Sequence, residues 1–169
     1  MAEVFKGLVN RSDKGAFMGV AGAGGTLTYH RMTKFTDLGG SKNPQEYSRQ
    51  YVDKSTEDTD VVGYSPTLSY GFDQYIGNPV HEDIAHIHDE ELLGDATIRN
   101  IAMIDFTSEG TTEGTFKARL RPFSIIPDAD GDSTDAYTYS GTCHAKDASV
   151  TGTATTLDGW ATCEFTEDV

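Results

Sequence analysis

The sequence has few of the features that mark secreted or membrane proteins. It contains two cysteines, Cys143 and Cys163, which are too few for a disulfide framework and lack the Cys/His spacing of a zinc site. We therefore expect two reduced, half-buried thiols.

No stretch approaches the roughly 20 apolar residues of a membrane helix. The beginning of the chain, MAEVFKGLVNRSDKGAF, has no apolar segment followed by a cleavage site. We expect a protein that is made in the cytosol and has no membrane partner.

Basic side chains are also scarce, since 13 Lys and Arg stand against 27 Asp and Glu, a net charge of −14. Residues 1–54 hold eight basic and five acidic side chains (net +3), whereas residues 55–169 hold five and 22 (net −17). An acidic surface repels a nucleic-acid backbone, so tight binding to DNA or RNA is not expected. The asymmetry suits contact between copies of the chain, although acids that only keep a protein soluble give the same total.

The order of turn signals and alternating residues predicts one mainly β domain. Residues 1–25, which end in a glycine-rich stretch, are typical of an extended N-terminal arm with a flexible joint, and residues 26–169 form the domain. Residues 37–60 form a long inter-strand loop. Apolar and polar residues alternate over 61–76, as in a strand. Further strands are expected from residue 26 and at 47–53, 96–106, 115–127, 136–150 and 160–165. The predicted fold is a β-sandwich or barrel with one flanking helix.

The flanking helix is predicted at about residues 79–91. Asn78 can accept hydrogen bonds from the first turn, and Pro79 suits the first helical position because it has no N–H to lose. The apolar stripe of this helix consists of Val80, Ile84 and Ile87. Three acidic residues at 89–91 are unfavourable at a helix C-terminus, so the regular helix is expected to end early.

Two segments resemble metal sites but lack the ligand spacing. In HEDIAHIHDEE (residues 81–91) only Glu82 and His86 are four apart, so a solvated helix face is the simpler interpretation. DADGDSTD (residues 128–135) has Ser133 and Tyr139 where an EF-hand loop needs Gly and Glu, and it predicts an acidic hairpin turn.

The motifs of nucleotide binding and of nucleophilic catalysis are missing from the sequence. The glycine-rich residues 19–25 do not end in the Gly-Lys-Ser/Thr sequence that binds phosphate, and no Gly-x-Ser-x-Gly nucleophile elbow occurs. We expect no catalytic residue, no cofactor and no metal, and hence a protein that is not an enzyme.

Several motifs resemble those of one family. They are YSP at residues 64–66 followed by alternating aromatics, NPVH at 78–81, DSTDAYTYSG at 132–141, and GTATT at 152–156 followed by Trp160, which is expected in the core. Over about residues 26–166 the chain is similar to the major tail protein, or tail tube protein, of long-tailed bacteriophages of Gram-positive hosts. No residue carries catalysis in that family.

The resemblance implies a structural virion protein. It implies β-sheets closed with a flanking helix, in hexameric rings that stack into a hollow tube through which phage DNA passes without tight binding. The implied partners are other copies of the chain together with the tape measure and the tail terminator or initiator proteins. Such tails assemble in the bacterial host cytoplasm.

The residues themselves suggest how such a tube would be built. Strands at 60–76 and 115–127 would form the wall by edge pairing between subunits. The segment 37–60 is longer than an ordinary hairpin loop, and such loops are usually functional or disordered. It would reach the next ring, its basic groups meeting the acidic body and its tyrosines serving as anchors. The residues assigned to this ring–ring contact are Lys42, Asn43, Tyr47, Arg49, Tyr51 and Lys54.

Other interpretations stay open at this point. The inner tube of a contractile tail would have a similar sequence, and a monomeric glycan-binding β-sandwich would show a cluster of exposed aromatics. A metal enzyme centred on residues 81–88 is a third alternative. In the tube interpretation, the arm of residues 1–25 would become ordered only on assembly.

Overall fold

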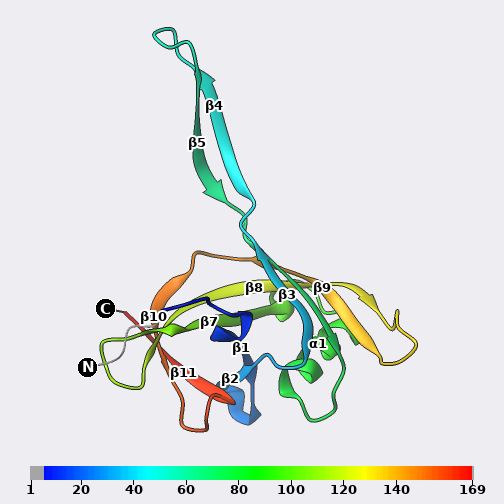
Figure 1. The fold of residues 1–169 in the computed structure, drawn as a ribbon. Helices are drawn as coiled ribbons and strands as arrows, with labels where there is room; N and C mark the ends of the chain where they lie inside the picture. The colour runs from blue at the N-terminus through cyan, green and yellow to red at the C-terminus, as the bar shows by residue number, and fades with distance from the viewer. Residues whose placement is uncertain (1–5, 169) are drawn as a thin grey trace.

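A computed structural model describes residues 6–168, which form a mainly β structure with a single α-helix (Figure 1). The strands pair in antiparallel fashion in the order β10-β11-β2-β1-β7-β8-β9-β6-β3, with an additional pairing of β10 to β8. A separate two-stranded sheet consists of β4 and β5. The strands of the main sheet are β1 (Lys14–Ala21), β2 (Leu27–Arg31), β3 (Phe35–Ser41), β6 (Thr67–Asp73), β7 (Ile98–Glu109), β8 (Phe116–Asp130), β9 (Thr138–Ala145), β10 (Val150–Thr155) and β11 (Thr162–Glu167).

The strand β8 joins a closed barrel to an open sheet. Its residues 116–120 pair with β10 and close a barrel of β10, β11, β2, β1, β7 and β8. Its residues 123–130 pair with β9, beyond which β6 and β3 continue as an open sheet. At 15 residues β8 is long enough to take part in both. This architecture confirms the predicted mainly β, barrel-like fold with a flanking helix.

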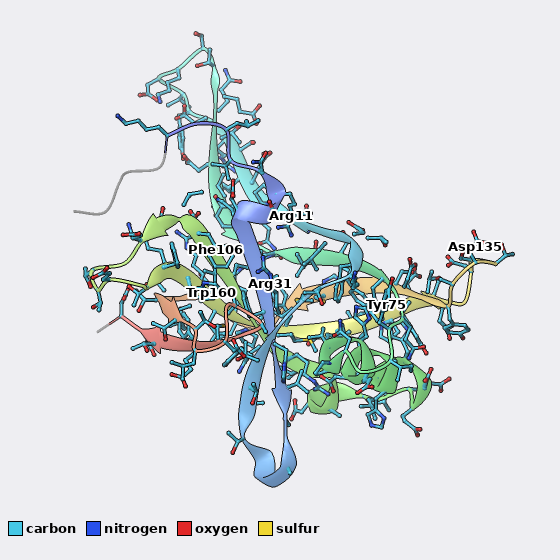
Figure 2. The ribbon with its side chains drawn as sticks, turned by 60° about the horizontal axis from the view of Figure 1, so that its bottom comes forward. Arg11, Arg31, Tyr75, Phe106, Asp135 and Trp160 are labelled. Carbon is cyan, nitrogen blue, oxygen red and sulfur yellow. The ribbon has the colours of Figure 1, made fainter. Side chains whose placement is uncertain are left out.

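Two separate apolar cores hold the structure together. One fills the barrel and includes Phe17, Ile104 and Ala154, with Trp160 packed against it. The other lies between the sheet and the helix and includes Met18 and Phe72. Successive side chains of a strand point to opposite faces, so neighbouring residues of β1 serve different cores. The ring of Trp160 lies 5.0 Å from that of Phe106 and 6.2 Å from that of Phe17 (Figure 2).

The predicted N-terminal arm is wrong from residue 14 onward. Residues 14–21 form β1, which lies between β2 and β7 in the sheet, and its residues 15–19 are buried. A short apolar run that is covered on both faces shows no two-residue alternation, so its strand character was invisible in the pattern. The domain therefore includes β1 and does not start at residue 26. Residues 1–5 of the predicted arm lie outside the described part of the chain.

The helix α1 (Pro79–Asp89) confirms the predicted helix start. The Asn78 side chain accepts hydrogen bonds from the N–H groups of Val80 and His81. The predicted stripe of Val80, Ile84 and Ile87 is buried against the sheet. The helix ends at Asp89, two residues before the predicted limit, as its acidic C-terminal sequence indicated. Within residues 6–168, no helix combines the length and the apolar composition needed to cross a membrane.

One face of this helix is less solvated than predicted, because His81 is fully buried. Its Nδ1 accepts the N–H of Tyr75 at 3.1 Å, and its Nε2 donates to the Thr33 carbonyl at 2.8 Å. This pair of contacts requires the neutral ring. The ring stacks on Phe72 with centroids 4.3 Å apart. His81 is therefore part of the core and ties the β2–β3 connection to the helix.

We predict that stability falls as the pH drops from 7 to 5. Burial lowers the pKa of His81 and of His88 below the ordinary histidine value of about 6.5. The unfolded chain then binds more protons than the folded one, so this stability is complete above the unfolded pKa and is lost as the pH falls toward the folded pKa. His81→Gln should flatten the pH dependence of the urea midpoint, whereas His86→Gln, at an exposed position, should not. The same slope in both variants would contradict this explanation.

Candidate functional site

The long segment between β3 and β6 is a β-hairpin that stands away from the body (Figure 1). Its strands are β4 (Pro44–Gln50) and β5 (Glu57–Tyr64), which pair over seven positions from Pro44↔Tyr64 to Gln50↔Glu57. The predicted long loop is thus present as a connection but is an ordered ribbon. The alternation of polar residues with Tyr and Val suits two strands that pair with each other and have no core to cover.

The base of the hairpin is fixed by a polar turn around Asn43. Its Nδ2 donates to the Ser65 carbonyl at 3.1 Å and to Thr67 Oγ1 at 3.2 Å. Its backbone has φ 45°, a conformation that Asn tolerates better than most residues. Lys42 and Asn43 therefore lie at the foot of the hairpin, whereas Tyr47, Arg49, Tyr51 and Lys54 lie along its shaft and tip. Their contact with another ring stays a prediction.

The hairpin exposes several large apolar side chains although it is a small two-stranded ribbon. An isolated two-stranded ribbon is at best marginally stable in water, and exposed apolar patches mark interaction surfaces. The large apolar side chains that it exposes are Tyr47, Tyr51, Val52, Val61, Val62 and Tyr64. These exposed side chains make the ribbon a candidate interaction surface.

The hairpin is acidic overall. Residues 44–64 hold five acidic side chains (Glu46, Asp53, Glu57, Asp58, Asp60) and two basic ones (Arg49, Lys54), a net charge of −3. Lys54 is already engaged, since its Nζ lies 2.8 Å from Asp58 Oδ2. Contact between the basic groups of this segment and the acidic body of another copy stays a prediction, and the net charge of the ribbon does not favour it.

The central strands β6 and β9 of the open sheet carry mostly polar side chains on the face away from the core. In β6, buried Leu68, Tyr70 and Phe72 alternate with half-buried polar or glycine positions. The residues of β6 and β9 on that second face are Thr67, Ser69, Gly71, Asp73, Thr138, Ser140, Thr142 and His144. No secondary-structure layer within residues 6–168 covers this face (Figure 1). The alternation over 67–73 was visible in the sequence, but its extension to the neighbouring strand β9 was not.

Two edges of this open sheet lack a second strand partner within the described residues, although the Arg11 guanidinium donates to the Leu38 carbonyl of β3 at 3.1 Å. On one side β3 pairs only with β6. On the other side the pairing of β7 with β8 stops at Ser124, so residues 125–130 of β8 have β9 as their strand partner on one side only. Unpaired strand edges offer backbone groups to another chain.

The segments that resembled metal sites serve local structure. Within residues 6–168 no group of three potential metal-ligating side chains converges. Residues 128–135 span the end of β8 and the projecting turn to β9, where Asp135 lies at the tip (Figure 2). Asp130 accepts the Tyr137 hydroxyl at 2.9 Å, and Asp132 accepts the Thr138 hydroxyl at 2.6 Å. These contacts are those of an acidic hairpin turn, as predicted.

The two thiols are more buried than predicted. Cys143 belongs to the core under the helix, and Cys163 belongs to the barrel core. Both are free, and burial raises the pKa of each thiol to about 12. Such groups are poorly reactive at neutral pH because the thiolate is the reactive form.

Solved structures of tail assemblies contain chains with a similar fold. One is a chain in the tail of an empty GTA particle computed with helical refinement and C6 symmetry, with a TM-score of 0.59 and 13% identity over 84% of this chain and 97% of that chain. Identity this low establishes the shared fold alone. A second is a chain in the six-fold symmetrised baseplate of the anti-feeding prophage, with a TM-score of 0.45 and 8% identity over 87% and 95% of the two chains, a likeness too weak to carry an argument. The sequence matches no protein-family model and no curated protein.

Proposed function

We propose that this protein is a structural subunit of a phage-like tail tube, and that it acts by self-assembly and not by catalysis. The observation that carries the proposal is the open antiparallel sheet, attached to a closed barrel, in which two edges lack a second strand partner and one polar face is uncovered within the described residues. A chain with the same fold occurs in a tail assembly of C6 symmetry. A heterologous contact between two different edges closes into a ring when the rotation between copies permits.

Ring closure would join the β3 edge of one copy to residues 125–130 of the next. The strands β8, β9, β6 and β3 run in alternating directions, so β3 and β8 are antiparallel across such a junction. Six copies with four strands each would give a wall of about 24 strands, wide enough for a channel since barrels of 16–18 strands already enclose one. The predicted wall segments 60–76 and 115–127 contain β6 and much of β8.

The uncovered face would line the channel. It carries hydroxyl side chains together with Gly71, Asp73 and His144, and the chain has a net charge of −14. A wall of this kind offers phosphate groups few favourable contacts, so phage DNA would pass through without being held. The hairpin would connect stacked rings, using the exposed tyrosines among the six predicted contact residues.

The same proposal implies the location and the partners of the protein. The chain would be part of the virion, assembled in the host cytoplasm, with tape measure and tail terminator or initiator proteins as further partners. We favour the major tail protein of a non-contractile tail of a Gram-positive phage over the inner tube of a contractile tail, because the sequence motifs resemble the former.

Negative-stain electron microscopy of concentrated protein, with light scattering on the same sample, tests the proposal. Rings or hollow tubes of one diameter are the expected result. A chain that stays monomeric at its highest soluble concentration and gives no cross-linked oligomers would contradict it.

A further inference from the structure

A depression lies at the end of the body opposite the hairpin. It encloses about 420 Å³. The residues around it come from the β2–β3 connection, the segment before α1, the first residues of α1 and the start of β11. They are His30, Arg31, Thr33, Lys34, Tyr75, Ile76, Gly77, Asn78, Pro79, Ala161 and Thr162. Sequence patterns did not predict this feature, because its parts are far apart in the chain.

The strands β3 and β6 place the depression opposite the hairpin. The hairpin leaves the sheet after Ser41 and returns at Thr67. Lys34 directly precedes the other end of β3, and Tyr75 follows the other end of β6. Each strand has seven residues, which span about 20 Å at a rise of about 3.3 Å per residue. The hairpin projects from the body beyond one end of β3 and β6 (Figure 1). Copies stacked in one orientation along these strands would therefore bring the hairpin of one toward the depression of the next.

The depression has basic side chains in its lining although the protein is acidic overall, and the Arg31 guanidinium lies 5.5 Å from the centre of the Phe106 ring. Arg31 and Lys34 line it, and none of the lining residues is acidic. The beginning of α1 adds the positive end of a helix dipole. Two carboxylates border the lining: Glu82 Oε1 accepts the N–H of Gly77 at 3.0 Å, and Asp158 Oδ2 accepts the Thr162 hydroxyl at 2.6 Å. Attraction for an acidic segment of a partner would therefore come from Lys34, on the side of the depression formed by the β2–β3 connection.

The rim of the depression is also apolar. Ile76 is 86% exposed and Tyr75 is 51% exposed. The Lys34 ammonium lies 5.4 Å from the centre of the Tyr75 ring, within reach of a cation–π contact. Lys34 has φ 62°, an unusual conformation for lysine that directs the chain into β3. Such backbone outliers often occur at binding sites.

The hairpin tip has the complementary chemistry. Val52 is fully exposed and Tyr51 is 48% exposed, and Asp53 follows them in a ribbon of net charge −3. We propose that the hairpin tip of one copy, at residues 51–53, docks in the depression of a second copy in the next ring. This inference rests on the proposed function and names the receiving surface for the hairpin. The contact is heterologous, so it repeats along a tube without limit.

Disulfide trapping tests the contact directly. Val52→Cys and Ile76→Cys proteins are mixed at high concentration and oxidised, and the mixed disulfide dimer is expected to exceed either self-dimer several-fold. The buried native thiols, Cys143 and Cys163, should not interfere. Val52→Cys mixed with Leu157→Cys is the matched control, since Leu157 is 93% exposed but lies outside the depression, and no enrichment is expected.

Charge exchange provides the second test. Asp53→Lys and Lys34→Glu should each stop tube growth, and the double variant should restore it because the attraction is recreated with the signs exchanged. Lys117→Glu makes the same change in net charge on the exposed face of β8 and should assemble as the wild type does. Tubes in both single variants, together with no mixed disulfide, would overturn the docking inference and leave the proposed function standing. Wild-type protein that forms neither rings nor tubes would contradict the proposed function itself.

Discussion

A chain whose residues 46–62 are replaced by an Asn-Gly turn is expected to keep its fold and to lose the ability to form tubes. The strands β4 and β5 pair only with each other, and no side chain of residues 41–57 is buried. Removing the ribbon therefore costs the body little stability. Gln45 and Gly63 are paired partners, so a two-residue type I′ turn can join them.

The measurements are circular dichroism and thermal unfolding for the fold, with sedimentation and electron microscopy for assembly. Isolated rings without stacking are the expected product, because the wall edges of β3 and β8 are unchanged. A full-length hairpin carrying Ser48→Thr is the matched control, since it keeps a hydroxyl at an exposed position of β4 and should still form tubes. Normal tubes formed by the shortened chain would contradict the proposed role of the hairpin in stacking. Deleting residues 39–46 is a less clean test, because Gly39, Gly40 and Ser41 belong to β3 and pair with β6.

Replacing Gly141 with valine is expected to be the most destabilising single substitution in the wall. A Cβ atom at this position of β9 would overlap the Ile126 carbonyl and the Tyr70 hydroxyl. That hydroxyl is hydrogen-bonded to His88 Nε2 at 2.7 Å, so moving it also breaks a partly buried polar contact. Overpacking costs about 1–3 kcal/mol and an unsatisfied buried polar group about 1–3 kcal/mol. We expect a loss of about 2–6 kcal/mol, a large part of the stability of an ordinary domain.

Urea unfolding followed by tryptophan fluorescence measures this loss. Gly40→Ala is the matched control, because Gly40 lies in the same sheet and a Cβ there meets only the Thr67 carbonyl, at 3.9 Å. It should change the unfolding free energy by less than about 1 kcal/mol. An unfolding midpoint of Gly141→Val close to that of the wild type would show that β8 or Tyr70 can shift away, and the packing explanation would then be wrong.

Local patterns in the sequence determined the helix and several strands. Asn78-Pro79 fixes the helix start by chemistry that acts within one turn, and the stripe of Val80, Ile84 and Ile87 chooses the buried face. Alternation at 67–73 gives β6 in the same way. The sequence pattern did not predict the buried strand β1. Residues such as Phe17 and Met18 have apolar neighbours on both sides in the chain, so no two-residue alternation of apolar and polar residues is present.

The sequence by itself determined a mainly β chain with one capped helix, no disulfide framework and an acidic body. Only the tertiary structure decided that β10 closes on β8 while β3 stays open, and that residues 44–64 form a projecting ribbon. It alone brings Lys34 and Tyr75 together at the end of the body opposite that ribbon. The physical reason is that antiparallel pairing joins segments distant in the chain through backbone hydrogen bonds, which every residue but proline can make. Local side-chain patterns therefore specify which strands form but not which edges meet.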